Sequence, residues 1–275
     1  MLGLSPDIMT AKSTDQLREE WNKLAGSYAQ RVSQITTKFY RAMLPFMQLA
    51  QARVVVEAGC GPGNGVDILR EQLPVDAKVL ANDIAAGFVE IVRGNRLPNV
   101  EVVEAVNEAL PYADGIADRY IANMCLHLVE FPDRMVAEAF RVLKPGSIAA
   151  FSIMGDRAQS SLTNIALQLR EKYATQHFRS PFHLSDLSAL KQLLTAAGFS
   201  RVITLEELYY IPKLDSGLLE GNILQHPLVV TVYEGLEEGR KERLRDDLRG
   251  LVEAVLQRQQ KPIAVHTRIA IAFKS

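Results

Sequence analysis

The chain has 275 residues, of which 48% are hydrophobic and 23% charged, a balance typical of a globular protein with a sizeable core. Its formal charge is −1 and it has no block of Lys and Arg, which argues against nucleic acid or an anionic membrane surface as the partner. No stretch approaches the roughly 18 unbroken apolar residues of a membrane span.

The small number of cysteines argues against a disulfide-rich domain and against a Cys-rich metal protein. Cys60 and Cys125 are too few for a disulfide framework or a Cys-rich metal site, and no H-E-x-x-H string occurs. The start of the chain, MLGLSPDIMT, lacks the pattern of a signal or transit peptide. We therefore expect a cytoplasmic protein without a bound metal ion.

Two helices are predicted before the first strand. Ser13 and Gln16 form the pattern of a capping box, and apolar residues at helical spacing continue from there to Tyr28. A second helical stretch covers about 33–50, with an interruption or kink near Pro45.

The stretch from Val54 to Val66, VVVEAGCGPGNGV, predicts a buried strand that ends in a tight turn and is followed at once by a helix. Glycine occupies every second position of that turn, at 59, 61, 63 and 65. Such a turn brings a ligand close to the backbone and to the N-terminus of the next helix, where a carboxylate or phosphate is favoured. The stretch therefore predicts a site for a nucleotide-type cofactor.

The spacing of the glycines discriminates between cofactors. Neither frame supplies the G-x-G-x-x-G of dinucleotide enzymes, and no Gly-Lys-Ser/Thr follows the turn. The remaining string, E-x-G-x-G-x-G with Glu57 at the end of the strand, resembles motif I of the class I S-adenosylmethionine (SAM) dependent methyltransferases. The resemblance implies that SAM is the cofactor and S-adenosylhomocysteine the product.

From residue 53 onward, strand and helix patterns alternate, which predicts an α/β fold with a doubly wound, mostly parallel sheet. Seven strands, the number that the methyltransferase resemblance implies, are expected at 53–58, 77–83, 100–104, 117–123, 147–153, 201–209 and 265–273. Helices are expected near 64–73, 86–94, 132–143 and 185–197, the last with Ser185 as its N-cap.

The sequence predicts one domain over 1–275. The methyltransferase resemblance implies that residues 1–50 form an N-terminal helical cover and 51–154 the cofactor-binding half. Two segments, 155–183 and 212–262, exceed the minimal alternation, and the second carries an amphipathic helix around Leu244 and Leu248. We interpret both as insertions that cover the substrate at the carboxyl ends of the strands.

Acidic and amide side chains follow the next strands. Asp83 ends the second strand, where a carboxylate can accept both ribose hydroxyls of a nucleoside, in SAM or in NAD. The string VNEALPYADG resembles the family's G-D-A-E-x-L-P-F stretch, with Val106 where the family has its Asp. Asn107 could supply a side-chain acceptor instead, and the backbone of Asn107 and Glu108 could meet the adenine ring.

The exit of the fourth strand, IANMCLHLVEFPD, supplies the remaining candidates. The resemblance places Asn123 beside the methionine part of SAM, with Met124 and Cys125 along the methyl-donor side. His127 is the candidate general base, because its ordinary pKa is near 6.5, although a structural role fits as well.

The complete set of expected site residues is as follows. Cofactor contacts are Tyr28, Glu57, Gly59, Cys60, Gly61, Gly63, Asp83, Ile84, Val106, Asn107, Glu108, Asn123, Met124 and Cys125; substrate contacts are Trp21, Phe178, His183 and Tyr209. Aromatic residues can stack on a planar or cationic substrate, and core packing is the alternative for each of them.

The resemblance implies a methyltransferase that acts on an O, N or C nucleophile of a small molecule, most like the ubiquinone/menaquinone-biosynthesis type. We expect a monomer or homodimer without a nucleic-acid or membrane partner. A SAM-binding protein without catalysis and, less well supported, an NAD(P)-binding oxidoreductase remain as alternatives.

Overall fold

The computed structural model describes residues 12–31, 33–175, 178–211, 216–258 and 263–275. Within them the chain forms two compact units. The larger unit comprises Lys12–Met154, His183–Glu207 and Thr267–Ser275, and the smaller comprises Gly155–Phe182 and Leu208–His266. The predicted insertions, 155–183 and 212–262, fall almost entirely in the smaller unit, and the prediction of one domain with two insertions stays a prediction.

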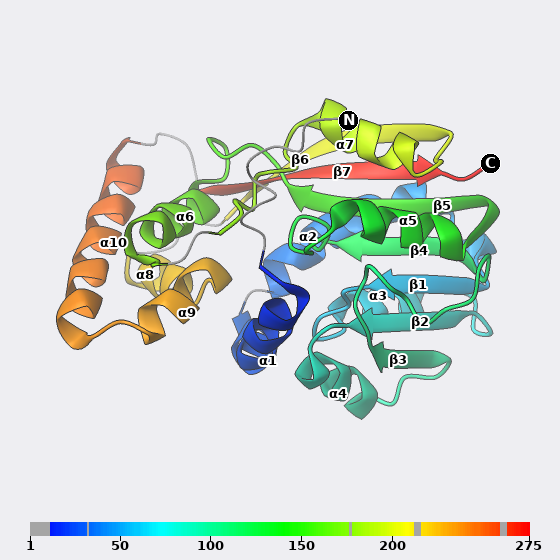
Figure 1. Ribbon diagram of the computed structural model, residues 1–275, viewed down its shortest axis with the longest axis horizontal. Helices are drawn as coiled ribbons and strands as arrows, with labels where there is room; N and C mark the ends of the chain where they lie inside the picture. Colours follow the sequence, from blue (N-terminus) through cyan, green and yellow to red (C-terminus); the bar gives the residue numbers. More distant parts are fainter. Residues whose placement is uncertain (1–11, 32, 176–177, 212–215, 259–262) are drawn as a thin grey trace. The chain divides into compact units, whose positions relative to one another are not determined.

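A seven-stranded sheet organises the larger unit, with the strand order β3-β2-β1-β4-β5-β7-β6 (Figure 1). The strands are β1 (Val54–Ala58), β2 (Lys78–Asp83), β3 (Val100–Glu104), β4 (Ala117–Asn123), β5 (Leu143–Met154), β6 (Arg201–Tyr210) and β7 (Ala264–Phe273). Strand β1 pairs in parallel with β2 and β4, and β7 runs antiparallel to β5. The predicted doubly wound, mostly parallel sheet is confirmed. Its strand order reverses between β1 and β4, where such sheets bind ligands.

The described larger unit contains the helices α1 (Thr14–Arg31), α2 (Ser33–Met43), α3 (Asn64–Gln72), α4 (Ala86–Gly94), α5 (Pro132–Val142) and α7 (Leu187–Ala196), of which α1 packs on α2 and α4. The capping box of α1 is formed, since the Ser13 N–H donates to Gln16 Oε1 at 2.9 Å and the Gln16 N–H donates to Ser13 Oγ at 3.3 Å. The interruption predicted near Pro45 is confirmed. Helix α2 ends at Met43 and gives way to short 3₁₀ turns, because Pro45 cannot continue an α-helix.

The N-cap of α7 differs from the prediction. Asp186, not Ser185, is the N-cap, and its carboxylate accepts a hydrogen bond from the Ala189 N–H at 2.7 Å. Both residue types are good N-caps, so the sequence alone could not choose between adjacent positions. The helix stops before Gly198, whose φ of +110° is in the region that glycine adopts readily.

Both faces of the sheet are buried. Val55 and Val79 pack with Tyr40 of α2 and Leu69 of α3 on one face. On the opposite face, Val56, Leu80 and Tyr120 pack with Met135 of α5 and Leu190 of α7. This arrangement explains the unbroken run of valines in β1, because a parallel central strand buries side chains on both sides. Each fully buried Val or Leu contributes about 1.5–3 kcal/mol.

The described part of the smaller unit contains α6 (Ser161–Tyr173), α8 (Ser216–Leu224), α9 (Pro227–Glu234) and α10 (Glu238–Arg258). The predicted amphipathic helix is α10, which buries Leu244, Leu248 and Val252. Tyr173 Oη of α6 donates to Asp247 of α10 at 2.6 Å. None of the described helices combines the length and the apolar content needed to cross a membrane.

His226 begins α9 as its N-cap, because its Nδ1 accepts a hydrogen bond from the Leu228 N–H at 3.1 Å. Burial, together with the nearby Arg170 charge, lowers the pKa of His226 to about 4, so this imidazole is neutral at physiological pH. Arg170 stacks over the Phe178 ring at 4.7 Å and donates to the Leu228 carbonyl at 3.2 Å. The polar groups of this unit thus join its helices and helix ends.

Candidate active site

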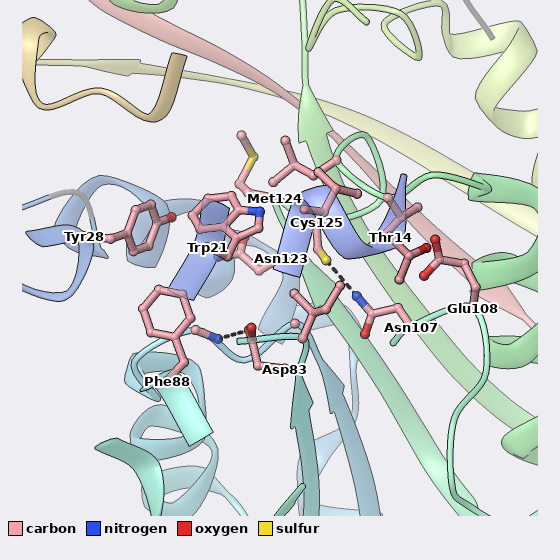
Figure 2. A pocket seen from close by; sticks show the side chains of 16 residues that line it. Thr14, Trp21, Tyr28, Asp83, Phe88, Asn107, Glu108, Asn123, Met124 and Cys125 are labelled. Carbon is pink, nitrogen blue, oxygen red and sulfur yellow. Dashed lines mark hydrogen bonds between the residues drawn. The ribbon is translucent and has the colours of Figure 1, made fainter. Parts of the chain in front are cut away.

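A cavity opens in the larger unit beyond the carboxyl ends of the parallel strands (Figure 2). The empty space between its walls, with the open solvent at the mouth included, is about 660 Å³. The lining residues are Thr14, Leu17, Trp21, Tyr28, Gly59, Gly61, Asp83, Ile84, Phe88, Asn107, Glu108, Asn123, Met124, Cys125, Leu128 and Val129. They come from α1, α4 and the segments at or after the ends of β1, β2, β3 and β4.

The Gly-rich turn after β1 forms one wall. Gly59 and Gly61 have φ of +66° and +53°, a conformation that other residues adopt only with strain. No atom lies within 4 Å of the place where a Cβ of Gly61 would be, whereas a Cβ on Gly59 would come within 2.5 Å of Cys125 Sγ. Gly61 thus leaves its backbone open to a ligand, and Gly59 permits close packing on the loop after β4.

Asp83 is fixed next to this turn. Its Oδ2 accepts from the Gly61 N–H at 2.8 Å, shown as a dashed line in Figure 2, and its Oδ1 accepts from the Ala85 N–H at 3.0 Å. Each oxygen keeps a second lone pair, so the carboxylate can accept two further hydrogen bonds. Burial raises the pKa of Asp83 to about 6, against the opposing effect of the backbone N–H donors.

The side chain of Asn107, after β3, is engaged by protein groups. Its Oδ1 accepts from Asn82 Nδ2 at 2.7 Å and its Nδ2 donates to Cys125 Sγ at 3.0 Å (Figure 2). One lone pair of Oδ1 is therefore used within the sheet, and the amide joins the ends of β2, β3 and β4. Burial raises the pKa of the Cys125 thiol well above its usual value, so the sulfur remains a neutral thiol.

The exit of β4 is held in one conformation. Ser152 of β5 donates from Oγ to Asn123 Oδ1 at 2.7 Å and accepts from the Met124 N–H at 2.8 Å. Asn123 Nδ2 also donates to the Thr36 carbonyl of α2 at 3.0 Å. Met124 has a φ of +53°, which is uncommon outside glycine and clusters at functional sites. The clamp on Ser152 holds this strained corner against the cavity.

An aromatic cluster forms the side of the cavity near Asp83. Trp21 and Tyr28 of α1 meet at 5.4 Å between ring centroids, and Phe88 of α4 lies 5.8 Å from Tyr28 and 6.3 Å from Trp21. These separations are those of rings in mutual contact, so the three rings form a packed wall with no space for a ligand between them. Burial raises the pKa of Tyr28 to about 12, and its hydroxyl stays protonated.

The first residue of helix α1, which lines the cavity, is held by a carboxylate. Thr14 donates from its N–H and from its Oγ1 to Glu130 Oε2, at 2.6 and 2.8 Å. Glu108 in turn accepts from the backbone N–H groups of Glu130 and Phe131, at 3.1 and 3.3 Å. Glu130 thus connects the start of α1 to the segment before α5, and Glu108 holds that segment; Thr14 and Glu108 are both labelled at the cavity in Figure 2.

The structure brings most of the expected cofactor residues to one cavity. Tyr28, Gly59, Gly61, Asp83, Ile84, Asn107, Glu108, Asn123, Met124 and Cys125 line it, as does Trp21, which was expected to contact the substrate. Their contacts with a cofactor stay predictions.

Other expected residues lie elsewhere. Glu57, Cys60, Gly63, Val106 and the candidate base His127 do not line the cavity, and His127 is buried. Phe178 and Tyr209 belong to the smaller unit, whereas His183 belongs to the larger unit outside the lining.

Sequence reasoning did not select Thr14, Leu17, Phe88, Leu128 and Val129 as site residues, although all five line the cavity. Leu17 follows the helical spacing of α1 and Phe88 lies in the first turn after Asp83, so their positions were the available signal. Thr14 and Leu17 share the helical face of Trp21 and Tyr28, which the sequence analysis did select, so the helical spacing along α1 was the signal for both.

The residues present fit the nucleoside part of SAM. The two oxygens of the Asp83 carboxylate can accept hydrogen bonds from the two hydroxyls of a ribose. The open space at Gly61 lets a ligand approach the backbone closely, and the apolar side chains of Ile84 and Leu128 can pack on a ring system. The site therefore accommodates the chemistry of the cofactor that the Gly-rich turn indicates.

Residues 56–151 match the family model described as a methyltransferase domain. The central part of the larger unit is therefore similar to SAM-dependent methyltransferase domains. This likeness supports the family, the enzyme class and the cofactor expected from the Gly-rich turn and the strand pattern. The matched residues include the second half of β1 and all of β2, β3 and β4, whose carboxyl ends surround the cavity.

Two curated relatives carry methyltransferase names. A malonyl-[acyl-carrier protein] O-methyltransferase from Methylococcus capsulatus is 30% identical over 150 residues, which cover 54% of this chain and 52% of the relative. A trans-aconitate 2-methyltransferase from Paracidovorax citrulli is 30% identical over 143 residues, 52% of this chain and 53% of the relative. The chain thus spans about half the length of these relatives, so the activity of the whole protein is a proposal.

Among solved structures, the fold resembles that of a putative methyltransferase in a complex with the Trm112 methyltransferase activator of Haloferax volcanii. The TM-score is 0.61 at 16% identity, with 94% of this chain and 96% of the other covered. At this identity the likeness shows the methyltransferase fold.

Proposed function

We propose that the protein transfers the methyl group of SAM to a small-molecule acceptor by in-line displacement. The observation that carries the proposal is the fixed pair of Asp83 and the Gly61 backbone at the cavity of the methyltransferase domain. This pair supplies an oriented acceptor for a ribose and a backbone that a ligand can approach closely.

The domain's own residues have three tasks in this reaction. Asp83 holds the nucleoside, and the corner at Asn123 and Met124, clamped by Ser152, orients the groups beside the methyl donor. Trp21 and Phe88 help to exclude water from the cavity. The bound SAM supplies a methyl carbon that is already electrophilic, so alignment is the main contribution of the protein and can lower the barrier by about 7–11 kcal/mol.

Proton removal is needed when the acceptor is protonated. We assign this role to His127, three residues after the corner at Met124, as part of the proposal. General-base catalysis would contribute about 10²–10⁴-fold. Its support is its position along the chain and the ability of an imidazole nitrogen to accept a proton, since His127 does not line the described cavity.

Carboxylate oxygen is the acceptor to test first. The names of the two curated relatives contain a malonyl thioester and trans-aconitate, which both carry free carboxylates. A carboxylate is ionised at neutral pH and needs no base, so such an acceptor would also account for a cavity that His127 does not reach. Phe178, His183 and Tyr209 stay predicted contacts of the acceptor.

The test is transfer of isotopically labelled methyl from SAM to a panel of small carboxylic acids, carboxyl thioesters, phenols and amines. We expect labelled methyl ester from at least one carboxylic acid or thioester, and no product with the Asp83→Ala variant. Bound SAM that remains unconverted with every acceptor would instead favour a SAM-binding protein without catalysis.

The proposal includes a cytoplasmic protein that acts as a monomer or homodimer. Cys60 and Cys125 are both free thiols, which supports a reducing compartment. Light scattering of the purified protein would give the oligomeric state directly.

A further inference from the structure

Glu57 is the acidic residue of the motif that precedes the Gly-rich turn, yet its side chain is only 3% exposed and does not line the cavity. It shares the β1 face of Val55, whose neighbours include residues of α2 and α3. On the adjacent strands the partners of Glu57 are the apolar Ala81 and Ile121. The carboxyl group therefore lies in the core of the sheet.

Two contacts define its surroundings. Tyr40 of α2 donates a hydrogen bond from its hydroxyl to Glu57 Oε2 at 3.3 Å. A Cβ placed on Gly65 would come within 2.1 Å of Glu57 Oε1 and within 2.5 Å of the Tyr40 ring. Gly65 is the second residue of α3, so the carboxyl and phenol groups together fill the space under the first turn of that helix.

The charges around Glu57 disfavour ionisation. Tyr40 on α2, Cys60 in the turn and Asp67 on α3 are the titratable groups that act on it, and none of the three is a cation. Burial, followed by the Asp67 charge, raises the pKa of Glu57 well above its usual range despite the hydrogen bond from Tyr40. Burial raises the pKa of Tyr40 as well, so its hydroxyl remains a donor.

We propose that Glu57 acts as a neutral carboxylic acid that, with Tyr40, positions the Gly-rich turn and the start of α3 without touching the cofactor. It is a positioning residue for the proposed SAM site, and the inference rests on that proposed function. It also ties α2 to the turn, because Tyr40 is the contact that α2 makes with the carboxyl group. The requirement at position 57 is then for a polar planar group of this size, with no requirement for negative charge.

The experiment compares SAM dissociation constants, measured by calorimetry at about pH 8, for wild type, Glu57→Gln, Glu57→Ala and Tyr40→Phe. Glu71→Gln is the matched control, because it neutralises an exposed glutamate of α3. We expect Glu57→Gln and Glu71→Gln to bind within about threefold of wild type, since the amide keeps the shape and the acceptor. Glu57→Ala, which leaves a cavity and an unpaired phenol, should weaken binding by about tenfold or more, and Tyr40→Phe by severalfold.

A second readout reports the charge of Glu57 without SAM. The infrared difference spectrum of wild type minus Glu57→Gln at about pH 8 should contain the C=O band of a protonated carboxyl group. A carboxylate band pair in its place would overturn the proposal, as would equal loss of affinity in Glu57→Gln and Glu57→Ala. Unchanged affinity in Glu57→Ala together with Tyr40→Phe would show that the pair does not position the turn.

The two proposals fail in different ways. If wild type binds no SAM, the proposed function fails, and the infrared band still decides whether Glu57 is neutral. If Glu57→Ala does not fold, Glu57→Gln and Tyr40→Phe carry the comparison, because neither leaves a large cavity.

Discussion

The two units use their polar side chains differently. In the larger unit, polar residues from the ends of several strands meet at one cavity, and Asp83 and Asn123 retain capacity for a ligand. In the smaller unit, the contacts of Tyr173 with Asp247, and of His226 and Arg170 with the backbone at Leu228, join helices to one another. The topology of a parallel sheet therefore brings polar residues together at the carboxyl ends of its strands. In the helical unit, the same residue types hold helices together.

The largest effect on the site of the larger unit is expected from the removal of one carboxylate. Asp83→Ala deletes two hydrogen-bond acceptors for ribose and the anchor of the Gly61 N–H. Hydrogen bonds to a charged group contribute about 1.5–3 kcal/mol each, so we expect SAM affinity to fall by more than about 100-fold. Calorimetric titration with SAM checks this, and an unchanged dissociation constant would contradict the assignment of the ribose site.

The proton-transfer role of His127 can be separated from cofactor binding. For an acceptor that must lose a proton, His127→Ala should lower kcat by about 100-fold while the dissociation constant of SAM stays constant. For a carboxylate acceptor the same variant should keep its rate, since no proton is removed. Rates measured from pH 6 to 9 with both classes of acceptor test this role. Full activity of the variant on both classes would show that His127 is not the general base.

The pH dependence of SAM binding sharpens the role of Asp83. Burial raises its pKa to about 6, and ribose hydroxyls donate to the ionised form, so affinity should be full above pH 7. As the pH falls below 6, the affinity for SAM should decrease, and well below the pKa it should fall by about tenfold for each pH unit. The sign for stability is the opposite, because a raised carboxyl pKa destabilises the cofactor-free fold as pH rises from about 4 to 6.

Asp83→Asn is the control for this titration. It should bind SAM more weakly than wild type at neutral pH and show a flat profile across the same range. A wild-type profile that is equally flat would mean that Asp83 is not the titrating group.

The smallest expected effect comes from the smaller unit. Asp247→Asn replaces a carboxylate that accepts from Tyr173 Oη and pairs with Lys172, a partly exposed contact. We expect the free energy of unfolding to fall by no more than about 1 kcal/mol, with SAM affinity unchanged. Urea unfolding together with calorimetry measures both, and a large loss of SAM affinity would show that this contact also serves the cofactor site.

The sequence predicted those site residues that topology alone positions. Gly59, Gly61 and Asp83 follow the ends of β1 and β2, and adjacent parallel strands bring such ends together whatever the side chains nearby. The same reasoning gave the doubly wound sheet. It also gave the start of α1, because the capping box is a local pattern of two residues.

Other features depend on contacts between segments distant in the sequence. The docking of Thr14 on Glu130 joins residues 116 positions apart, and the clamp of Ser152 on Asn123 depends on the register of β4 and β5. The spacing of residues along the sequence does not predict which distant residues form such pairs. Glu57 is different, since the alternation of side chains along β1 already places it on the face of Val55, where the structure shows it buried.

The central claim is that the cavity of the larger unit binds SAM. Calorimetric titration of the purified wild-type protein with SAM and, separately, with S-adenosylhomocysteine tests it most directly. Binding of both in the micromolar range, at one site per chain, is the result that we predict. Binding of neither, under conditions in which the protein is folded, would contradict the assignment of the Gly-rich turn and Asp83 to this cofactor.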